Sequence, residues 1–99
     1  MRRDGSLKVF GKIWRLFWLR PNEIVPGLEP SENGLCEAPD TKGKRIFIRE
    51  GQNVKDTLDT LLHEMLHAAD WDKGEYWVHD VANDITRNLL KHFDIRRKD

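Results

Sequence analysis

Two histidines and a glutamate form the pattern with the clearest chemical meaning in this chain, His63-Glu64-Met65-Leu66-His67. On a helix, residues four apart lie about 40° apart around the surface and one turn apart along the axis. Both imidazoles can then reach one metal ion. Glu64 lies about 100° around the helix from His63, where it can face a metal-held water instead of binding the metal. Metal-assisted hydrolysis needs this arrangement.

A catalytic zinc site usually has three protein ligands and one open position, so a third ligand must come from another segment. Glu75 and His79 are the candidates, one turn apart after a turn at Gly74. We favour His79. Glu75 stays open, because an acid in a first helical turn also has a purely structural use, complementing the helix dipole. Cys36 could bind a metal, but a lone cysteine is more often a small packed side chain.

Acidic side chains near the motif could orient the ligating imidazoles. Asp59 precedes His63 by one turn, Asp70 follows His67, and Asp84 could reach across from a second helix. The alternative for each is an ordinary solvated acid. The sequence does not identify an oxyanion donor, although Tyr76, the only tyrosine, is a candidate.

The elements that must position these residues follow from hydrophobic spacing. Asn53 is suited to cap a helix over residues 53–70, and Gly74 separates it from a second helix over residues 75–93. Alternation predicts a strand or hairpin over residues 7–19 with Gly11 at a turn or bulge, and short strands over residues 35–37 and 45–49. We therefore expect an α+β fold with one domain over residues 1–99. In it, a small antiparallel sheet packs on the helix with the motif and on a second, C-terminal helix.

Charge and composition limit the function classes. The 17 Lys and Arg balance the 17 Asp and Glu, which argues against a general nucleic-acid coat, although a basic N-terminal strand leaves such a contact open. Residues 54–84 are acidic and hold three of the four histidines, a setting that attracts a divalent cation. The sequence has no apolar run of transmembrane length and no signal-peptide pattern. The single cysteine fits a reducing, cytoplasmic compartment.

The segment His63-Glu64-Met65-Leu66-His67-Ala68-Ala69-Asp70-Trp71, with the later Glu75 and a helix ending in Leu89-Leu90, resembles small zincin metallopeptidases. SprT-like and phage-encoded metallopeptidases and minimal gluzincins are the most similar groups. The resemblance covers roughly residues 7–93, and its specific part is the H-E-x-x-H core.

This resemblance implies a small sheet over the active-site helix, with an edge strand that aligns an extended peptide. It also implies that His63 and His67 are ligands, that Glu64 is the general base, and that a glutamate or histidine on the next helix completes the site. The chain departs from the glutamate-ligand pattern by offering His79. It departs from the metzincins because Asp70 and Lys73 stand where their glycine and third histidine would be.

From these observations we expect a zinc-dependent metallopeptidase that hydrolyses a peptide or protein, with Glu64 taking a proton from the metal-held water. The alternative is a zincin-derived regulatory or interaction module that keeps the metal for structure. A third possibility is an inhibitor or host-takeover protein without metal. The intact Glu64 favours hydrolysis, because a structural metal site has no need of a general base.

Overall fold

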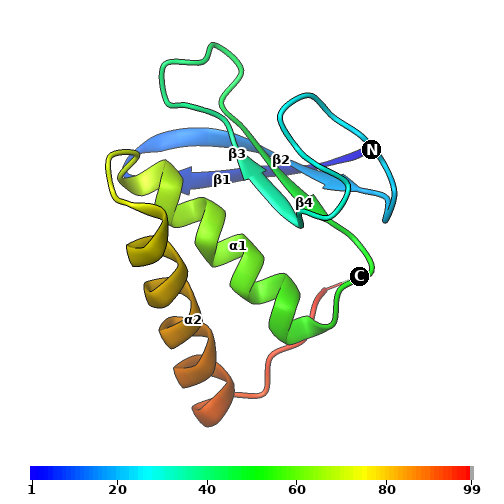
Figure 1. Ribbon diagram of the computed structural model, residues 1–99. Coiled ribbons are helices and arrows are strands. Elements are labelled where there is room, and N and C mark those ends of the chain that lie inside the picture. The colour runs from blue at the N-terminus through cyan, green and yellow to red at the C-terminus, as the bar shows by residue number, and fades with distance from the viewer. Residues whose placement is uncertain (99) are drawn as a thin grey trace.

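Four strands precede two helices in the structure, a computed structural model that describes residues 1–98 (Figure 1). The strands are β1 (Arg2–Val9), β2 (Lys12–Leu19), β3 (Gly34–Cys36) and β4 (Arg45–Arg49), and the helices are α1 (Val54–Ala69) and α2 (Glu75–His92). The expected α+β class, with a small sheet followed by two helices, is confirmed. Asp99, which the expected domain includes, lies outside the described residues.

The four strands form one sheet in the order β1-β2-β4-β3. β1 pairs with β2 and β3 pairs with β4 in antiparallel fashion, but β2 and β4 are parallel. The sheet is therefore mixed, whereas we expected an antiparallel one. The chain leaves β2 through residues 20–33, runs back as β3 and reverses again as β4, so β4 enters the sheet in the direction of β2. This order leaves β3 as an edge strand.

The β1–β2 hairpin decides which side chains face the helices. Phe10 and Gly11 have φ angles of 50° and 75° and form its two-residue turn. Because of this turn, odd-numbered residues of β1 and even-numbered residues of β2 share one face of the sheet; Leu7, for example, pairs with Trp14. This face packs against Ala68 of α1, and its core residues are Val9, Trp14, Leu16, Trp18, Ile46 and Ile48. The opposite face carries a smaller cluster of Leu19, Leu28 and Phe47.

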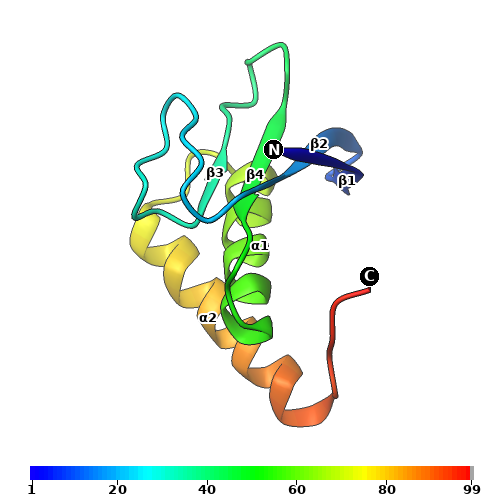
Figure 2. The same ribbon diagram turned by 90° about the vertical axis from the view of Figure 1, so that its right-hand side faces the viewer.

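The two helices form successive layers. α1 lies against the sheet, and α2 lies beside α1 without reaching the sheet (Figures 1 and 2). Val78, Ala82 and Thr86 are fully buried on the inner face of α2. The position of α2, and of any group it carries, therefore depends on its packing against α1. Within residues 1–98, no helix has both the length and the apolar character needed to cross a membrane.

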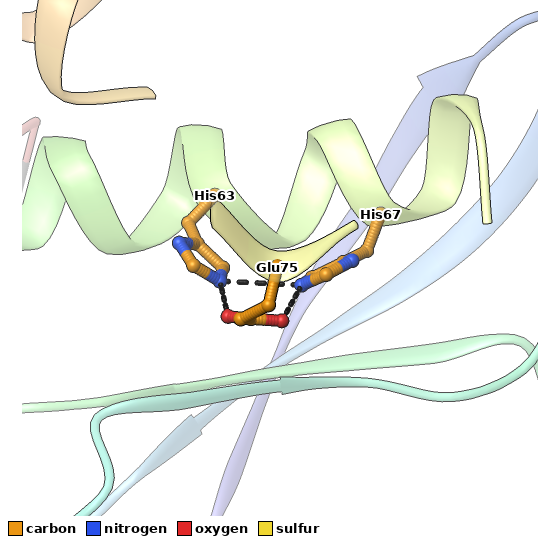
Figure 3. A group of neighbouring side chains, drawn as sticks. All are labelled: His63, His67 and Glu75. Atoms are coloured by element: carbon orange, nitrogen blue, oxygen red, sulfur yellow. Dashed lines mark hydrogen bonds and ion pairs between the residues drawn. The ribbon is translucent and has the colours of Figure 1, made fainter. Parts of the chain in front are cut away.

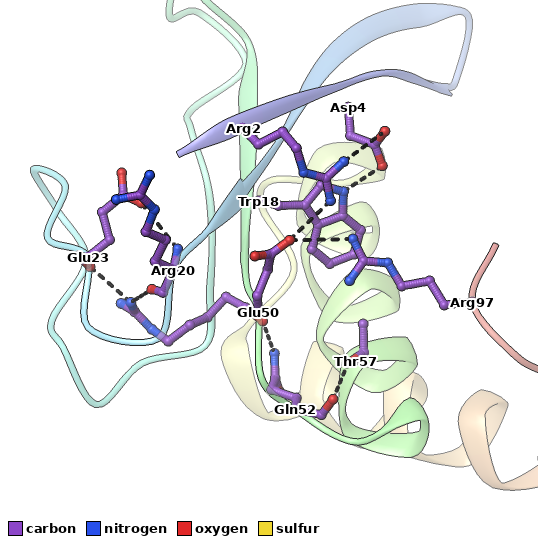
Figure 4. Close-up of polar contacts among 10 residues, drawn as sticks. Arg2, Asp4, Trp18, Arg20, Glu23, Glu50, Gln52, Thr57 and Arg97 are labelled. Atoms are coloured by element: carbon purple, nitrogen blue, oxygen red, sulfur yellow. Dashed lines mark hydrogen bonds and ion pairs between the residues drawn. The ribbon is translucent and has the colours of Figure 1, made fainter. Parts of the chain in front are cut away.

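Arg2 and Arg97, which are far apart in the sequence, meet at Glu50, just before α1. Arg97 lies over the Trp18 ring with its guanidinium carbon 3.8 Å from the centroid, and its Nη2 is 3.6 Å from Glu50 Oε1. Arg2 pairs with the same carboxylate at 3.1 Å, and Trp18 Nε1 donates to Asp4 at 2.7 Å (Figure 4). Asn53 caps α1, as expected, by accepting the Asp56 N–H at 2.8 Å.

A buried arginine organises the long loop that precedes β3. Arg49 is 4% exposed and donates to the backbone carbonyls of Glu23 and Glu32, each at 2.9 Å. Its guanidinium also donates to the Arg20 carbonyl at 3.0 Å, and its backbone N–H donates to the Asn33 carbonyl at 2.7 Å. One side chain thus fixes the course of residues 20–33 and brings Glu32 and Asn33 to the edge of the site described next.

Candidate metal centre

His63, His67 and Glu75 converge from the two helices (Figure 3). One donor atom from each lies within 4.8 Å of the others. His63 Nε2 is 2.6 Å from Glu75 Oε1, and His67 Nε2 is 3.0 Å from Glu75 Oε2. The two Nε2 atoms are 3.2 Å apart. The structure thus brings together the two histidines expected from the motif and one of the two candidates for the third ligand.

The local structure explains this convergence. His63 and His67 are one turn apart on α1, and their ring centroids are 4.9 Å apart. Glu75 is the first residue of α2. Helical side chains lean toward the N-terminus of their helix, so the Glu75 carboxylate projects back over the turn toward the imidazoles. The histidine side chains are 19% and 15% exposed, and that of Glu75 is 68% exposed.

The structure does not bring His79 to this cluster. It lies one turn further along α2, its side chain is 66% exposed, and its Nδ1 is 3.4 Å from Asp80 Oδ1. Of the two candidates, Glu75 contacts both imidazoles in this structure, whereas His79, which we favoured from the sequence, does not. The cause is the start of α2 at Glu75, which leaves His79 a full turn too far from the histidines of α1.

The three donors can hold a divalent metal ion. Tetrahedral zinc with bonds of about 2.0–2.1 Å holds neighbouring donor atoms about 3.3 Å apart, and the two imidazole nitrogens are 3.2 Å apart. Burial lowers the pKa of His67, as does the nearby His63, while Glu75 opposes the shift. His67 is therefore neutral near pH 7, which is the form that binds metals.

Glu64 lies apart from the donor cluster and has a different environment. It is 7% exposed, and its pKa is raised to about 8. Burial is the main cause, followed by the negative charges of Glu75 and Glu32, while a hydrogen bond from the Cys36 backbone opposes the shift. As expected from the helical spacing, this carboxyl group is turned away from the ligand line while remaining next to the site.

Gly34 allows β3 to approach Glu64 closely. A Cβ atom at this position would lie 2.7 Å from Thr60 Cγ2 and 2.8 Å from Glu64 Oε2. These distances are too short for any real side chain, so the close contact between β3 and α1 requires glycine. No local sequence pattern marks Gly34 as necessary, because the need for glycine comes from contact with α1, which follows much later in the chain.

A cleft of about 700 Å³ opens beside the cluster, between β3, α1 and the turn that leads into α2. His63, Glu64, His67 and Glu75 all line it. Glu32, Asp59, Trp71 and Lys73 also line the cleft. Glu32 and Trp71 carried no sequence signal for a site, since one sits in an irregular loop and the other in a turn.

The remaining candidates from the sequence have other surroundings. Cys36 lines the cleft, but burial raises the pKa of its thiol to about 12, so it stays protonated and is a poor metal ligand. Asp70 accepts the Asp72 N–H at 3.3 Å, and Asp84 is exposed. Tyr76 is 89% exposed and is not among the residues that line the cleft. Asp59 is the one expected neighbouring acid that reaches the cleft.

Comparisons of the chain with known protein families, curated proteins and solved structures found no match. The chemistry of the site is therefore inferred from its geometry. Two imidazoles and a carboxylate can hold a divalent cation, and a separate buried carboxyl group beside them can exchange a proton with water. Both groups face a cleft that is large enough for part of a peptide.

Proposed function

We propose that this protein is a zinc-dependent peptidase. One observation carries the proposal: three metal-binding side chains lie within 4.8 Å of one another in a cleft that also contains a buried fourth group, Glu64. A site that used metal for structure alone would have no need of this additional carboxyl group. His63, His67 and Glu75 would hold the ion, with its open position toward the cleft.

A zinc ion in this position would supply Lewis acidity, which polarises a carbonyl group and makes water easier to deprotonate. Glu64 would accept a proton from the attacking water and pass it to the leaving amine. A pKa of about 8 makes Glu64 a stronger base than an ordinary carboxylate. A cation held by Glu75 would also favour the ionised form of Glu64, because it offsets one of the negative charges that raise the pKa.

The edge strand supports a peptide as the substrate. Glu37 N–H donates to the Arg45 carbonyl, and Arg49 N–H donates to the Asn33 carbonyl. Alternation in an antiparallel pair then turns the backbone groups of Leu35 toward β4 and those of Gly34 and Cys36 away from it. The Cys36 N–H donates to Glu64. The Gly34 N–H and carbonyl groups and the Cys36 carbonyl lie beside Glu64 and can pair with an extended peptide.

We also propose a reducing, cytoplasmic setting. Cys36 is buried and unpaired, and it packs in the main core cluster next to Glu64. A free thiol at this place is preserved in a reducing compartment.

The variant Glu64→Gln tests the proposed function. The amide has nearly the size of the carboxyl group but cannot accept a proton, so we expect zinc binding and the fold to be kept and peptide hydrolysis to be lost. Zinc content is measured on the purified protein, and hydrolysis is measured by mass spectrometry on a diverse peptide library. Unchanged turnover in this variant would contradict the role of Glu64. A zinc-loaded wild type that binds peptides but cleaves none would favour the non-catalytic interaction module.

A further inference from the structure

Two carboxylates in the cleft are not used by the candidate metal centre. Asp59 lies on α1 one turn before His63, and Glu32 lies in the loop that Arg49 organises. Neither belongs to the donor cluster, and neither forms an ion pair within residues 1–98. Glu32 accepts only the backbone N–H of Glu29, at 2.9 Å. Both carboxylates are therefore free to pair with a bound cation.

The backbone that carries Glu32 is fixed. Arg49 Nε donates to the Glu32 carbonyl at 2.9 Å, and the Asn33 carbonyl accepts the Arg49 N–H at 2.7 Å. The Arg49 guanidinium is directed at backbone carbonyls and forms no ion pair with the Glu32 carboxylate, so the negative charge remains. Glu32 and Asp59 line the same cleft as Glu64. Both carboxylates are thus in place in the cleft before any ligand binds.

The direction of β3 determines which part of a bound peptide would lie near Glu32 and Asp59. Gly34 abuts Thr60 and Glu64, whereas Cys36 belongs to the core cluster that includes Met65 and Ala68 further along α1. β3 and α1 therefore run in the same direction. A peptide paired antiparallel to β3 runs the opposite way, so its C-terminal part approaches the beginning of α1.

We propose that Glu32 and Asp59 select substrates that carry lysine or arginine on the C-terminal side of the scissile bond. This inference rests on the proposed peptidase function. The carboxylates lie on that side of the candidate metal centre because Asp59 precedes His63 by one turn, and Glu32 belongs to the segment that leads into β3. A cationic side chain in the first two positions after the cleaved bond would lie between them. An acidic side chain would be repelled there.

The experiment uses the zinc-loaded full chain and three peptides that differ only at one such position, which carries lysine, glutamine or glutamate. Cleavage sites in a peptide library, mapped by mass spectrometry, supply the parent peptide. We expect kcat/KM for the lysine peptide to exceed that for the glutamate peptide about 10-fold, and the ratio to fall with added salt. In the double variant Glu32→Gln/Asp59→Asn the ratio of kcat/KM for the lysine and glutamate peptides should approach one.

Matched controls remove the same charges outside the cleft. Asp56→Asn lies on α1 one turn before Asp59, and Glu29→Gln lies in the loop of Glu32, yet neither residue lines the cleft. Both controls should keep the preference. The reversal Glu32→Lys/Asp59→Lys should change the preference from the lysine to the glutamate peptide. If the peptides are cleaved but the preference is absent, or is the same in the double variant, the inference is wrong and the proposed function stands.

A second measurement separates recognition from catalysis. Binding of the same peptides to zinc-loaded Glu64→Gln is followed by fluorescence anisotropy, and we expect the same order of affinities. If the wild type cleaves nothing but this order holds and depends on Glu32 and Asp59, the proposed function fails and the recognition of cationic peptides stands. Equal affinities for all three peptides, together with absent cleavage, would overturn both.

Discussion

Glu75 is the residue on which the candidate metal centre depends most, because it is the one donor that does not come from α1. Its carboxylate contacts both imidazoles, at 2.6 and 3.0 Å. An acid at the first position of a helix is also favoured by the helix dipole, so its presence there has two physical reasons. The two reasons have different consequences. If Glu75 only stabilises the helix dipole, its removal leaves metal binding intact; if Glu75 is a metal ligand, its removal weakens metal binding.

We predict that Glu75→Ala and His79→Ala have opposite effects on zinc affinity. The first variant leaves two protein ligands, so affinity should fall more than about 100-fold. The second removes an exposed side chain whose nearest polar partner is Asp80, so affinity should stay at the wild-type value. Competition with a chromophoric chelator measures both. Retention of zinc by Glu75→Ala, with loss in His79→Ala, would show that the third ligand is His79.

The sequence offered two candidates for the third ligand but could not show which of them lies nearer to the two histidines. Relative to Val78, Glu75 lies near 60° and His79 near 100° around the helix, so both border the buried face. The choice depends on where α2 begins and on how the turn from Asp70 to Gly74 directs it. The start and the direction of α2 depend on tertiary packing. The proximity of His63 and His67 depends only on α1, so their spacing in the sequence was enough to predict it.

At the scale of elements, the two helices were predictable and the sheet pairing was only partly so. Each helix has a long apolar stripe, and α1 has a side-chain cap from Asn53. β3 has only three residues and its pairing with β4 crosses a loop with no periodic pattern. The parallel pairing of β2 with β4 follows from the long connection through residues 20–33, which the buried Arg49 holds in place.

The contact of β3 with α1 leads to a prediction for Gly34→Ala. The added Cβ would lie 2.7 Å from Thr60 Cγ2 and 2.8 Å from Glu64 Oε2, so strand and helix must separate. We expect the free energy of unfolding to fall by about 1–3 kcal/mol and hydrolysis to fall further, because Glu64 moves. Chemical denaturation and peptide cleavage are the measurements.

Two further variants test the cause of this effect. Thr60→Ser removes the clashing methyl group but keeps the hydroxyl that donates to Gln52 at 3.0 Å, so it should partly restore stability to Gly34→Ala. Gly74→Ala adds the same methyl group where no atom lies within 4 Å, and it should change stability little. If Gly34→Ala were as stable as the wild type, the close packing of β3 on Glu64 would be incorrect.

For the whole molecule, the order of the layers determines how zinc binding and stability are connected. The sheet packs on α1, whereas α2 contacts only α1 among the named elements. Two donors belong to α1 and one to α2. An ion held by all three would therefore join the outermost layer to the rest of the domain at the end where α2 begins. The acidic character of residues 54–84, seen in the sequence, places this cation in a favourable field.

We predict that zinc raises the melting temperature of this protein and that the increase disappears in acid. A ligand at about 100 times its Kd stabilises the folded state by about 2.7 kcal/mol, which corresponds to roughly 10–20 °C for a domain of this size. The folded-state pKa of His67 is lowered below 6.5, mainly by burial, so its imidazole is free of a proton at pH 7 and zinc meets little competition there. As the pH falls through and below that lowered pKa, protons compete for the ligands and the zinc-induced increase is lost. Calorimetry at pH 7.5 and pH 5, with zinc and with a chelator, measures the effect.

Hydrogen exchange should show added protection at the start of α2 in the zinc form. Glu75→Ala is the control, because it should melt at the same temperature with and without zinc. A zinc-induced increase that persists unchanged in Glu75→Ala would mean that the ion binds elsewhere.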